Sequence, residues 1–243
     1  MPIYLGSNAV KGSVGSSDVK EIYLGSTLVY QNLPPYTAGA DIMLDGIKNT
    51  ANGHSNITLT WTDLSGNGNN ASISFGSTDA WGTNGLSIQN NGTRVRLSTE
   101  LFTSNFTMEF CVRLSSLYNY GTLVRAVNQS SVRDAWITSG GDTVLRVRSA
   151  YDTSDTNLSI SALYTIAFTR SGNTQKTYIN GVLKDTFTRT VSSGSDNSFD
   201  IFASSVADNR HIKGYAYAFR HYSSVLSAAE LLRNYNVDYD RFI

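Results

Sequence analysis

Apolar and polar residues alternate most regularly over residues 106–114. Every second residue of this segment, Phe-Thr-Met-Glu-Phe-Cys-Val-Arg-Leu, is apolar. Successive side chains of a β-strand point to opposite faces of its sheet, so the pattern predicts a strand with one face in the core. Burying five apolar side chains contributes about 1.5–3 kcal/mol each, which favours a place at the centre of the sheet. On the other face we expect Thr107, Glu109 and Arg113 to meet solvent.

Shorter segments of strand-like composition follow along the chain, separated by Gly, Asn and Ser residues that are typical of turns. They cover residues 71–75, 86–89, 93–98, 122–127, 135–138, 143–148, 164–170, 176–179, 182–187, 199–203 and 214–222. Asn180-Gly181 between two of them is the strongest short hairpin signal, so neighbouring strands should be antiparallel. Many short strands without α/β alternation predict an all-β fold, an antiparallel two-sheet β-sandwich of jelly-roll type.

One short helix is predicted near the C-terminus, where Ser227 and Glu230 have the spacing of a capping box. Leu226 and Leu231 stand at the positions of a hydrophobic staple across the start of the same helix. We expect two to three helical turns that close the sandwich and have no catalytic role. The residues expected to pack on the sandwich are Leu231, Leu232 and Tyr235.

The N-terminal segment contains an internal repeat, because the sequence Ile-Tyr-Leu-Gly-Ser at residues 3–7 recurs at residues 22–26. Each copy predicts a strand-turn-strand unit, and an isolated hairpin is only marginally stable in water. We therefore expect the copies to pair with each other, with the main domain or with another chain. Two adjacent prolines at 34 and 35 interrupt regular structure. They divide the chain into a β-hairpin module at residues 1–33 and a sandwich domain at residues 36–243.

Composition narrows the class of protein. The chain has zero net charge and 16% charged residues, without the basic stripe with which a nucleic-acid-binding protein contacts phosphates. Cys111 is the only cysteine, so no disulfide can form within the chain. No segment reaches the ~20 apolar residues of a membrane span, and the first residues lack the features of a signal peptide. We expect the protein to be made in the cytoplasm.

In residues 61–70, Trp-Thr-Asp-Leu-Ser-Gly-Asn-Gly-Asn-Asn, we expect a strand to run into a loop of unusual composition. Gly and Asn tolerate positive φ angles, so the loop can wind tightly, with Asp63 and Ser65 capping its amide groups. Two interpretations remain open. The loop is either a purely structural corner or a cradle for one Ca²⁺, which prefers oxygen ligands. In the second case the ligands would be Asp63, Ser65, Asn67 and Asn69.

The same loop carries a resemblance to a known family. The segment from Asp45-Gly46 through His54 to residues 61–69 resembles the opening of laminin-G-like, concanavalin-A-like jelly-roll domains, especially those of phage and prophage tail and fibre proteins. Residues 220–231, with Arg-His-Tyr and Leu-Ser, resemble the last strand and trailing helix of that family. The resemblance spans about residues 40–243 and implies a lectin-like sandwich. The repeated N-terminal segment is similar to short modules of phage structural proteins, which would suggest attachment; hairpins packed on the sandwich are the alternative.

Patterns of catalytic residues are missing from the sequence. A retaining glycosidase on such a fold needs two carboxylates at alternate positions of one strand. The four glutamates, at positions 21, 100, 109 and 230, lie in different segments. The three histidines, at positions 54, 211 and 221, are far apart in sequence, and nothing favours a catalytic triad. We therefore predict that the chain is not an enzyme and place glycoside hydrolysis last among the alternatives.

Sugar binding fits the sequence best. A lectin site combines an aromatic ring, which packs on the apolar side of a pyranose, with amide, carboxylate or guanidinium groups held on loops. The candidate residues are Tyr118, Asn119, Tyr120, Arg133, Asp134, Tyr151, Asp152, Asp208, Asn209 and Arg210.

The candidate residues and the family resemblance together predict a non-catalytic carbohydrate-binding or host-surface-adhesion module of a phage virion. Its partners would be a cell-surface glycan of a bacterial host and, through residues 1–33, other virion proteins. A homo-oligomer would raise the avidity of weak sites. The alternative is a structural or decoration domain of the virion without a sugar ligand.

Overall fold

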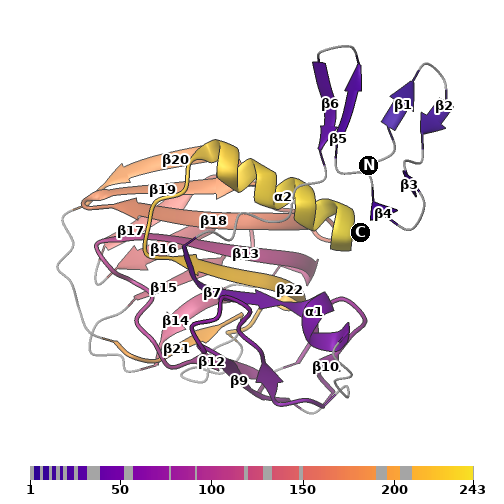
Figure 1. Cartoon of the computed structure of the whole chain (residues 1–243). Coiled ribbons are helices and arrows are strands. Elements are labelled where there is room, and N and C mark those ends of the chain that lie inside the picture. Colours follow the sequence, from indigo (N-terminus) through magenta and orange to yellow (C-terminus); the bar gives the residue numbers. More distant parts are fainter. Residues whose placement is uncertain are drawn as a thin grey trace.

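The computed structural model of the chain describes residues 3–5, 8–10, 13–14, 17–18, 21–24, 27–31, 39–51, 57–76, 78–90, 92–117, 120–127, 133–147, 150–189, 196–202 and 210–242. Its main body consists of two large antiparallel sheets that lie face to face, with a helix across the outside of the first sheet (Figure 1). This architecture confirms the all-β sandwich predicted from the strand pattern.

The first sheet has the strand order β10-β11-β22-β13-β18-β19-β20, and β7 also pairs with β22. Its strands are β7 (Ala40–Asp45), β10 (Ala80–Trp81), β11 (Leu86–Ile88), β13 (Asn105–Ser116), β18 (Leu163–Ser171), β19 (Thr174–Ile179), β20 (Val182–Thr188) and β22 (Lys213–Tyr222). Strand β13 lies between β18 and β22, which confirms its predicted central place.

The second sheet has the strand order β17-β16-β15-β14-β21-β12-β9-β8. Its strands are β8 (Thr60–Trp61), β9 (Ala71–Ser74), β12 (Arg94–Leu97), β14 (Gly121–Ala126), β15 (Arg133–Ile137), β16 (Thr143–Val147), β17 (Ala150–Ser154) and β21 (Phe199–Ile201). Predicted strands agree with these boundaries within two residues, whereas β7, β10 and β17 were not predicted.

The core lies between the two sheets. The side chains that β13 buries there are Phe106, Met108, Phe110, Val112 and Leu114, as the alternation predicted. Aromatic rings from both sheets meet at its centre, where the ring of Phe110 lies 5.8 Å from that of Phe202. Close packing of this kind explains why the fold holds together without a disulfide.

Helix α2 (Ala228–Phe242) lies across the outside of the first sheet (Figure 1). Its capping box is confirmed, since Ser227 donates from N and Oγ to Glu230 Oε2 at 2.7 and 2.8 Å. The helix has 15 residues, about four turns, and is longer than expected. Leu231 is buried as predicted, but Leu232 is 43% exposed, because adjacent helical residues are about 100° apart around the axis.

The expectation that Thr107 and Glu109 meet solvent is wrong, because α2 and the segment that leads into it cover this face of β13. Both side chains are fully buried. Thr107 Oγ1 donates to the Ser224 carbonyl at 2.8 Å and accepts from the Leu226 amide at 2.9 Å. Glu109 Oε2 accepts from Asn234 Nδ2 at 2.7 Å. Alternation therefore identified which residues share a face, but not what packs on that face.

The N-terminal segment forms two-stranded hairpins. They are β1 (Ile3–Leu5) with β2 (Asn8–Val10), β3 (Ser13–Val14) with β4 (Ser17–Asp18), and β5 (Glu21–Leu24) with β6 (Thr27–Gln31). The repeated sequence thus contributes the first strand of a hairpin in both copies, as predicted.

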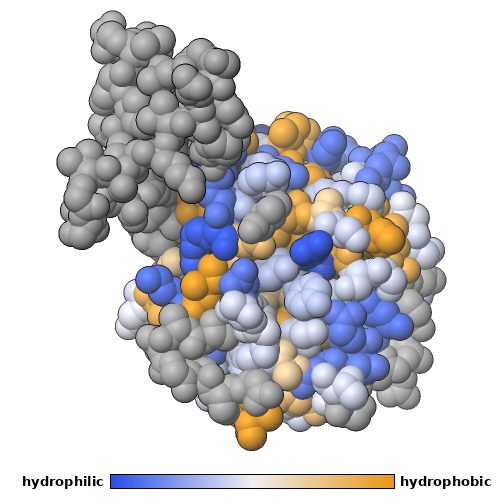
Figure 2. All heavy atoms as spheres, turned by 90° about the vertical axis from the view of Figure 1, so that its right-hand side faces the viewer, coloured by the Kyte–Doolittle hydropathy of each residue, from blue (hydrophilic) through white to orange (hydrophobic). Residues whose placement is uncertain are grey.

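A short helix that was not predicted, α1 (Gly46–Ala51), follows β7. Within the described ranges, no helix combines the length and hydrophobicity needed to cross a membrane. Figure 2 shows the side of the molecule that lies at the right of Figure 1, and on its coloured part apolar residues occur in scattered groups among polar ones.

Candidate ligand-binding face

Five neighbouring strands of the second sheet each place one charged residue in a row across its outer face. From β16 to β12 the row consists of Arg146, Asp134, Arg125, Asp200 and Arg96. Each residue lies directly opposite the next one in the strand register. Their sequence neighbours, such as Leu145 and Val95, are buried in the core, so the row points away from it. Opposed residues of unlike charge stabilise strand pairing along the whole row.

Both aspartates of the row are buried and held by arginine. Arg146 binds Asp134 through Nε at 2.6 Å and through a second contact from Nη2. Arg96 binds Asp200 in the same two-point manner, at 2.9 and 3.4 Å. Nη1 of Arg125 lies 3.9 Å from Asp134 Oδ2. Two-point pairing restricts the arginine side chains, so the row forms a preorganised surface.

Two aromatic rings adjoin the row. Trp136 follows Asp134 by two residues on β15 and therefore lies on the same face. Its ring is 5.8 Å from that of Tyr120, measured between centroids. The guanidinium carbon of Arg146 lies 5.2 Å from the Trp136 ring and that of Arg210 lies 4.5 Å from the Tyr120 ring. Both distances allow cation–π interaction, and Tyr120 remains 41% exposed for contact with a ligand.

The backbone of Tyr120 is in the left-handed region, with a φ of 67°. For a residue other than glycine this conformation costs about 1–3 kcal/mol and persists only when its surroundings hold it in place. Contacts with Trp136 and Arg210 are among those surroundings. Because such strain is concentrated at ligand sites, Tyr120 is the strongest single candidate for ligand contact.

We call the surface formed by these eight residues the arginine face. Its members are Arg96, Tyr120, Arg125, Asp134, Trp136, Arg146, Asp200 and Arg210. Four arginines and two aspartates give it a formal charge of 4 − 2 = +2. Burial lowers the pKa of Arg125, Asp134 opposes this effect, and the nearby guanidinium groups of Arg210 and Arg146 lower the pKa further. Positive charge is therefore in excess on this face.

Three residues proposed from the sequence come together here, namely Tyr120, Asp134 and Arg210. Tyr118, Asn119, Asp208 and Asn209 lie outside the described residues, as does the side chain of Tyr151.

Arg133 and Asp152 do not join the arginine face. Arg133 lies on β15 together with Asp134, and Asp152 lies on β17 together with Tyr151, so the expectation that these four residues belong to loops is wrong. Arg133 points away from Asp134, its sequence neighbour, and binds Glu100 at 2.9 Å. Asp152 is buried and accepts from Arg189 Nε at 2.8 Å. Neighbouring residues of a strand point to opposite faces, so adjacent polar residues need not share a site.

The sequence did not identify five members of this face as site residues, namely Arg96, Arg125, Trp136, Arg146 and Asp200. Arg125 and Arg146 each stand between apolar residues of a short strand, which is a usual pattern for the outward face of a sheet. That pattern does not say which other strand lies alongside. The row could therefore not be assembled without the strand order.

The loop after β8, predicted as a corner or a Ca²⁺ cradle, is closed by hydrogen bonds to Asp63. Its Oδ1 accepts from the amides of Met43 and Ser65, both at 2.9 Å. Its Oδ2 accepts from Ser65 Oγ at 2.8 Å and from the Asn69 amide at 2.9 Å. Four donors thus occupy this one carboxylate.

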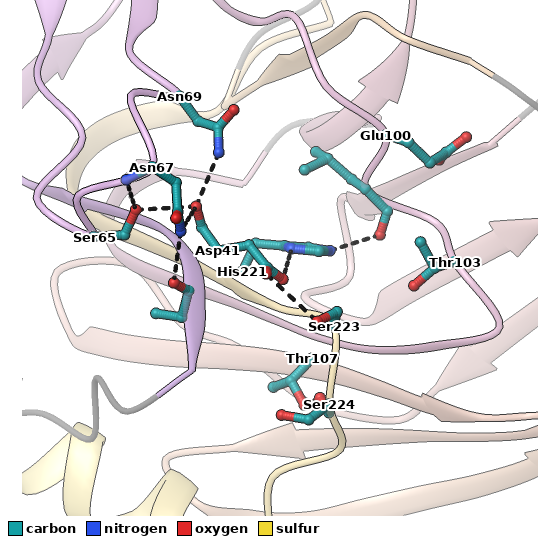
Figure 3. Close-up of polar contacts among 12 residues, drawn as sticks. Asp41, Ser65, Asn67, Asn69, Glu100, Thr103, Thr107, His221, Ser223 and Ser224 are labelled. Atoms are coloured by element: carbon teal, nitrogen blue, oxygen red, sulfur yellow. Dashed lines mark hydrogen bonds and ion pairs between the residues drawn. The ribbon is translucent and has the colours of Figure 1, made fainter.

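The side-chain amides of the same loop also act as donors. Nδ2 of Asn67 and Nδ2 of Asn69 donate to the Asp41 carbonyl at 3.1 and 3.0 Å (Figure 3). Among the described residues, no three His, Cys, Asp or Glu side chains are grouped to hold a metal ion. A Ca²⁺ at Asp63 would have to displace the donors now bound there. The geometry favours the structural corner over the calcium cradle as the interpretation of this loop.

A buried histidine continues the same network (Figure 3). His221 Nε2 donates to the Leu101 carbonyl at 2.9 Å, and Nδ1 lies 3.2 Å from Asp41 Oδ2. Both ring nitrogens of His221 thus have a polar partner in this buried position. The hydrogen bond with His221 is the main cause that lowers the pKa of Asp41.

One family model matches the chain. It is described as the Concanavalin A-like lectin/glucanases superfamily and covers residues 89–232, which is more than half of the chain. The chain shows no significant sequence match to a curated protein.

Several solved structures are similar in fold. Domain 4 of AbnA, a GH43 extracellular arabinanase from Geobacillus stearothermophilus, in complex with arabinotriose, matches with a TM-score of 0.64 and 19% identity, over 80% of this chain and 97% of that domain. The botulinum neurotoxin serotype D binding domain has a TM-score of 0.61 and 18% identity, over 82% of this chain and 52% of that one. Trypanosoma rangeli sialidase in complex with sialic acid has a TM-score of 0.65 and 14% identity, over 91% of this chain and 36% of that one. At these identities the likeness shows a shared fold.

Proposed function

Because the chain belongs to the Concanavalin A-like lectin/glucanases superfamily, we propose that it is a non-catalytic module that binds a glycan or a glycan-bearing receptor through the arginine face. The observation that carries this proposal is an exposed Tyr120 ring beside guanidinium groups on one surface. An aromatic ring packs on the apolar side of a sugar. Guanidinium groups then donate hydrogen bonds to its oxygen atoms.

The structural relatives support a binding role in general terms. The arabinanase domain is in complex with arabinotriose, and the neurotoxin fragment is a binding domain. Those proteins share the fold of this chain at low sequence identity. That this chain also binds a sugar or a receptor is therefore part of our proposal.

The non-catalytic part of the proposal is supported by the environment of the carboxylates. Asp134 and Asp200 are buried and bound by arginine. Glu109 on β13 and Asp238 on α2 both approach Arg220, but both side chains are fully buried. A glycosidase needs two carboxylates on either side of an accessible glycosidic bond. These pairs therefore favour binding over hydrolysis.

The biological setting is proposed from the sequence resemblance. We infer a module of a phage tail, baseplate or fibre that is located in the virion and is attached to other virion proteins through residues 1–33. Several copies on one particle would combine weak single sites into useful avidity for a glycan on a bacterial host.

Binding of the full chain, biotinylated and assembled on fluorescent streptavidin, tests this proposal. Candidate host cells and purified cell-wall glycans serve as targets, and we expect Tyr120→Ala to reduce the bound signal by about tenfold or more, because a lost contact is multiplied over several copies. Tyr239→Ala is a matched control, because Tyr239 on α2 is 40% exposed and its ring also lies 5.8 Å from another aromatic ring.

Two results would contradict the proposal. Equal binding by the wild type and Tyr120→Ala would move the site away from the arginine face. No binding to any glycan or host surface, together with stable assembly with virion proteins, would favour a structural or decoration domain.

A further inference from the structure

The arginine face also indicates the charge of its ligand. Building on the proposed function, we propose that this face recognises glycans that carry a negative charge, with a carboxylate or phosphate group held between Arg125, Arg146 and Arg210. The sugar ring that bears this group would lie against Tyr120.

The positive excess of the face is local, because the whole chain has zero net charge. Asp134 forms ion pairs with both Arg146 and Arg125. Asp200 lies opposite Arg125 in the register and is bound by Arg96. Among the described residues, no carboxylate forms an ion pair with Arg210, whose guanidinium lies over the Tyr120 ring. Arg125 and Arg146 thus share Asp134, and Arg210 lies within electrostatic range of Arg125.

These guanidinium groups repel one another and cannot lose their charge, since arginine stays protonated in proteins. Burial is the main cause that lowers the pKa of Arg125; Asp134 and Asp200 oppose this effect, whereas the guanidinium groups of Arg210 and Arg146 add to it. A bound anion would relieve the repulsion. The planar fork of arginine matches the oxygen atoms of carboxylates and phosphates in pairs.

Hydrogen-bond capacity points the same way. A neutral sugar presents hydroxyl groups that both donate and accept, and its recognition usually draws on protein donors and acceptors together. On the arginine face the donors outnumber the acceptors, because the carboxylates of Asp134 and Asp200 are buried and already bound by arginine. A ligand rich in acceptors suits such a surface, and an acidic glycan is of that kind.

Binding to simple charged polymers tests the inference on the full chain in the same streptavidin assembly. The probes are polygalacturonate for the carboxylate, poly(glycerol phosphate) for the phosphate, and dextran as a neutral polymer. We expect at least one charged probe to bind at least about tenfold more strongly than dextran. Binding should weaken severalfold between 50 and 500 mM NaCl, since the Debye screening length falls from roughly 14 Å to roughly 4 Å over this range.

Variants localise the effect. Arg210→Gln should reduce binding of the charged probe about tenfold, because it removes one charge-assisted contact, and Arg210→Lys should retain part of it. Lys184→Gln is the control, since it removes the same charge from an exposed position on β20 in the other sheet. The preferred probe distinguishes a carboxylate from a phosphate ligand.

Three outcomes would overturn the inference. Salt-insensitive binding of dextran that depends on Tyr120 would exclude an acidic ligand and leave the proposed function intact. Tighter binding of a single-stranded oligonucleotide than of either acidic polymer would identify a nucleic-acid surface instead. Binding of none of the probes, with no binding to host glycans, would overturn the proposed function itself.

Discussion

Replacing Glu109 with glutamine should stabilise the protein at pH 8 and have a much smaller effect at pH 5. Glu109 is fully buried, and its Oε2 lies 3.8 Å from Nη1 of Arg220. Both carboxylate oxygens of Asp238 already bind Arg220, at 2.9 and 2.5 Å. An ionised Glu109 would leave this buried group with one excess negative charge. A protonated Glu109 leaves it neutral.

The magnitude follows from the pKa of this carboxyl group. Burial raises the pKa of Glu109 from its ordinary value of 4.5 to about 7, while Arg220 opposes the rise and Asp238 adds to it. Between these two pH values the folded protein keeps a proton that the unfolded chain has lost, so stability falls as pH rises through this window. The loss amounts to about 3 kcal/mol. Glutamine has no proton to lose and removes this pH dependence.

Urea unfolding followed by tryptophan fluorescence at several pH values between 5 and 8 measures the effect. The free energy of unfolding of Glu109→Gln should exceed that of the wild type by an amount that grows by about 2–3 kcal/mol over this range. Glu230→Gln is the control, because it makes the same substitution in the partly exposed capping box, where the amide oxygen can still accept from Ser227. Parallel pH profiles for the wild type and Glu109→Gln would refute the reasoning.

Thr107→Asp should destabilise the fold by roughly 2–4 kcal/mol, because it buries a charge beneath the segment that leads into α2. Thr188→Asp at an exposed position of β20 should not destabilise it, and equal melting temperatures of the two variants would contradict this prediction. The pKa of Asp41 is lowered, chiefly by its hydrogen bond with His221, so Asp41 stabilises the fold above its ordinary pKa of 3.8 and the contribution is lost as pH falls below that value. Asp41→Asn should therefore flatten the acid limb of a stability profile, and an unchanged limb would refute the pairing. Millimolar Ca²⁺ added to chelator-treated protein should leave its melting temperature unchanged, because four hydrogen-bond donors occupy the Asp63 carboxylate. A rise in melting temperature that Asp63→Asn abolishes would instead establish a calcium site.

The sequence by itself determined most of the secondary structure, because the signals involved act over a few residues. Alternation placed β13, and the capping box placed the start of α2. The Asn180-Gly181 turn has φ angles of 54° and 76° and joins β19 to β20, as predicted. Strand β17 escaped prediction because it is an edge strand with few apolar residues, and such a segment resembles a loop.

Only the tertiary structure decided which surfaces these elements form. Arg96 and Asp200 are 104 residues apart, and the strand order makes them neighbours in the row that underlies the arginine face. Likewise, alternation alone predicts that Glu109 faces solvent. In the folded protein, α2 packs on that face and places Asn234, 125 residues further along the chain, against Glu109. Local propensity governs each strand or helix separately. Pairing and packing between distant segments depend on the free energy of the whole fold, so the charged face and the buried carboxylate emerge only when all strands are in place.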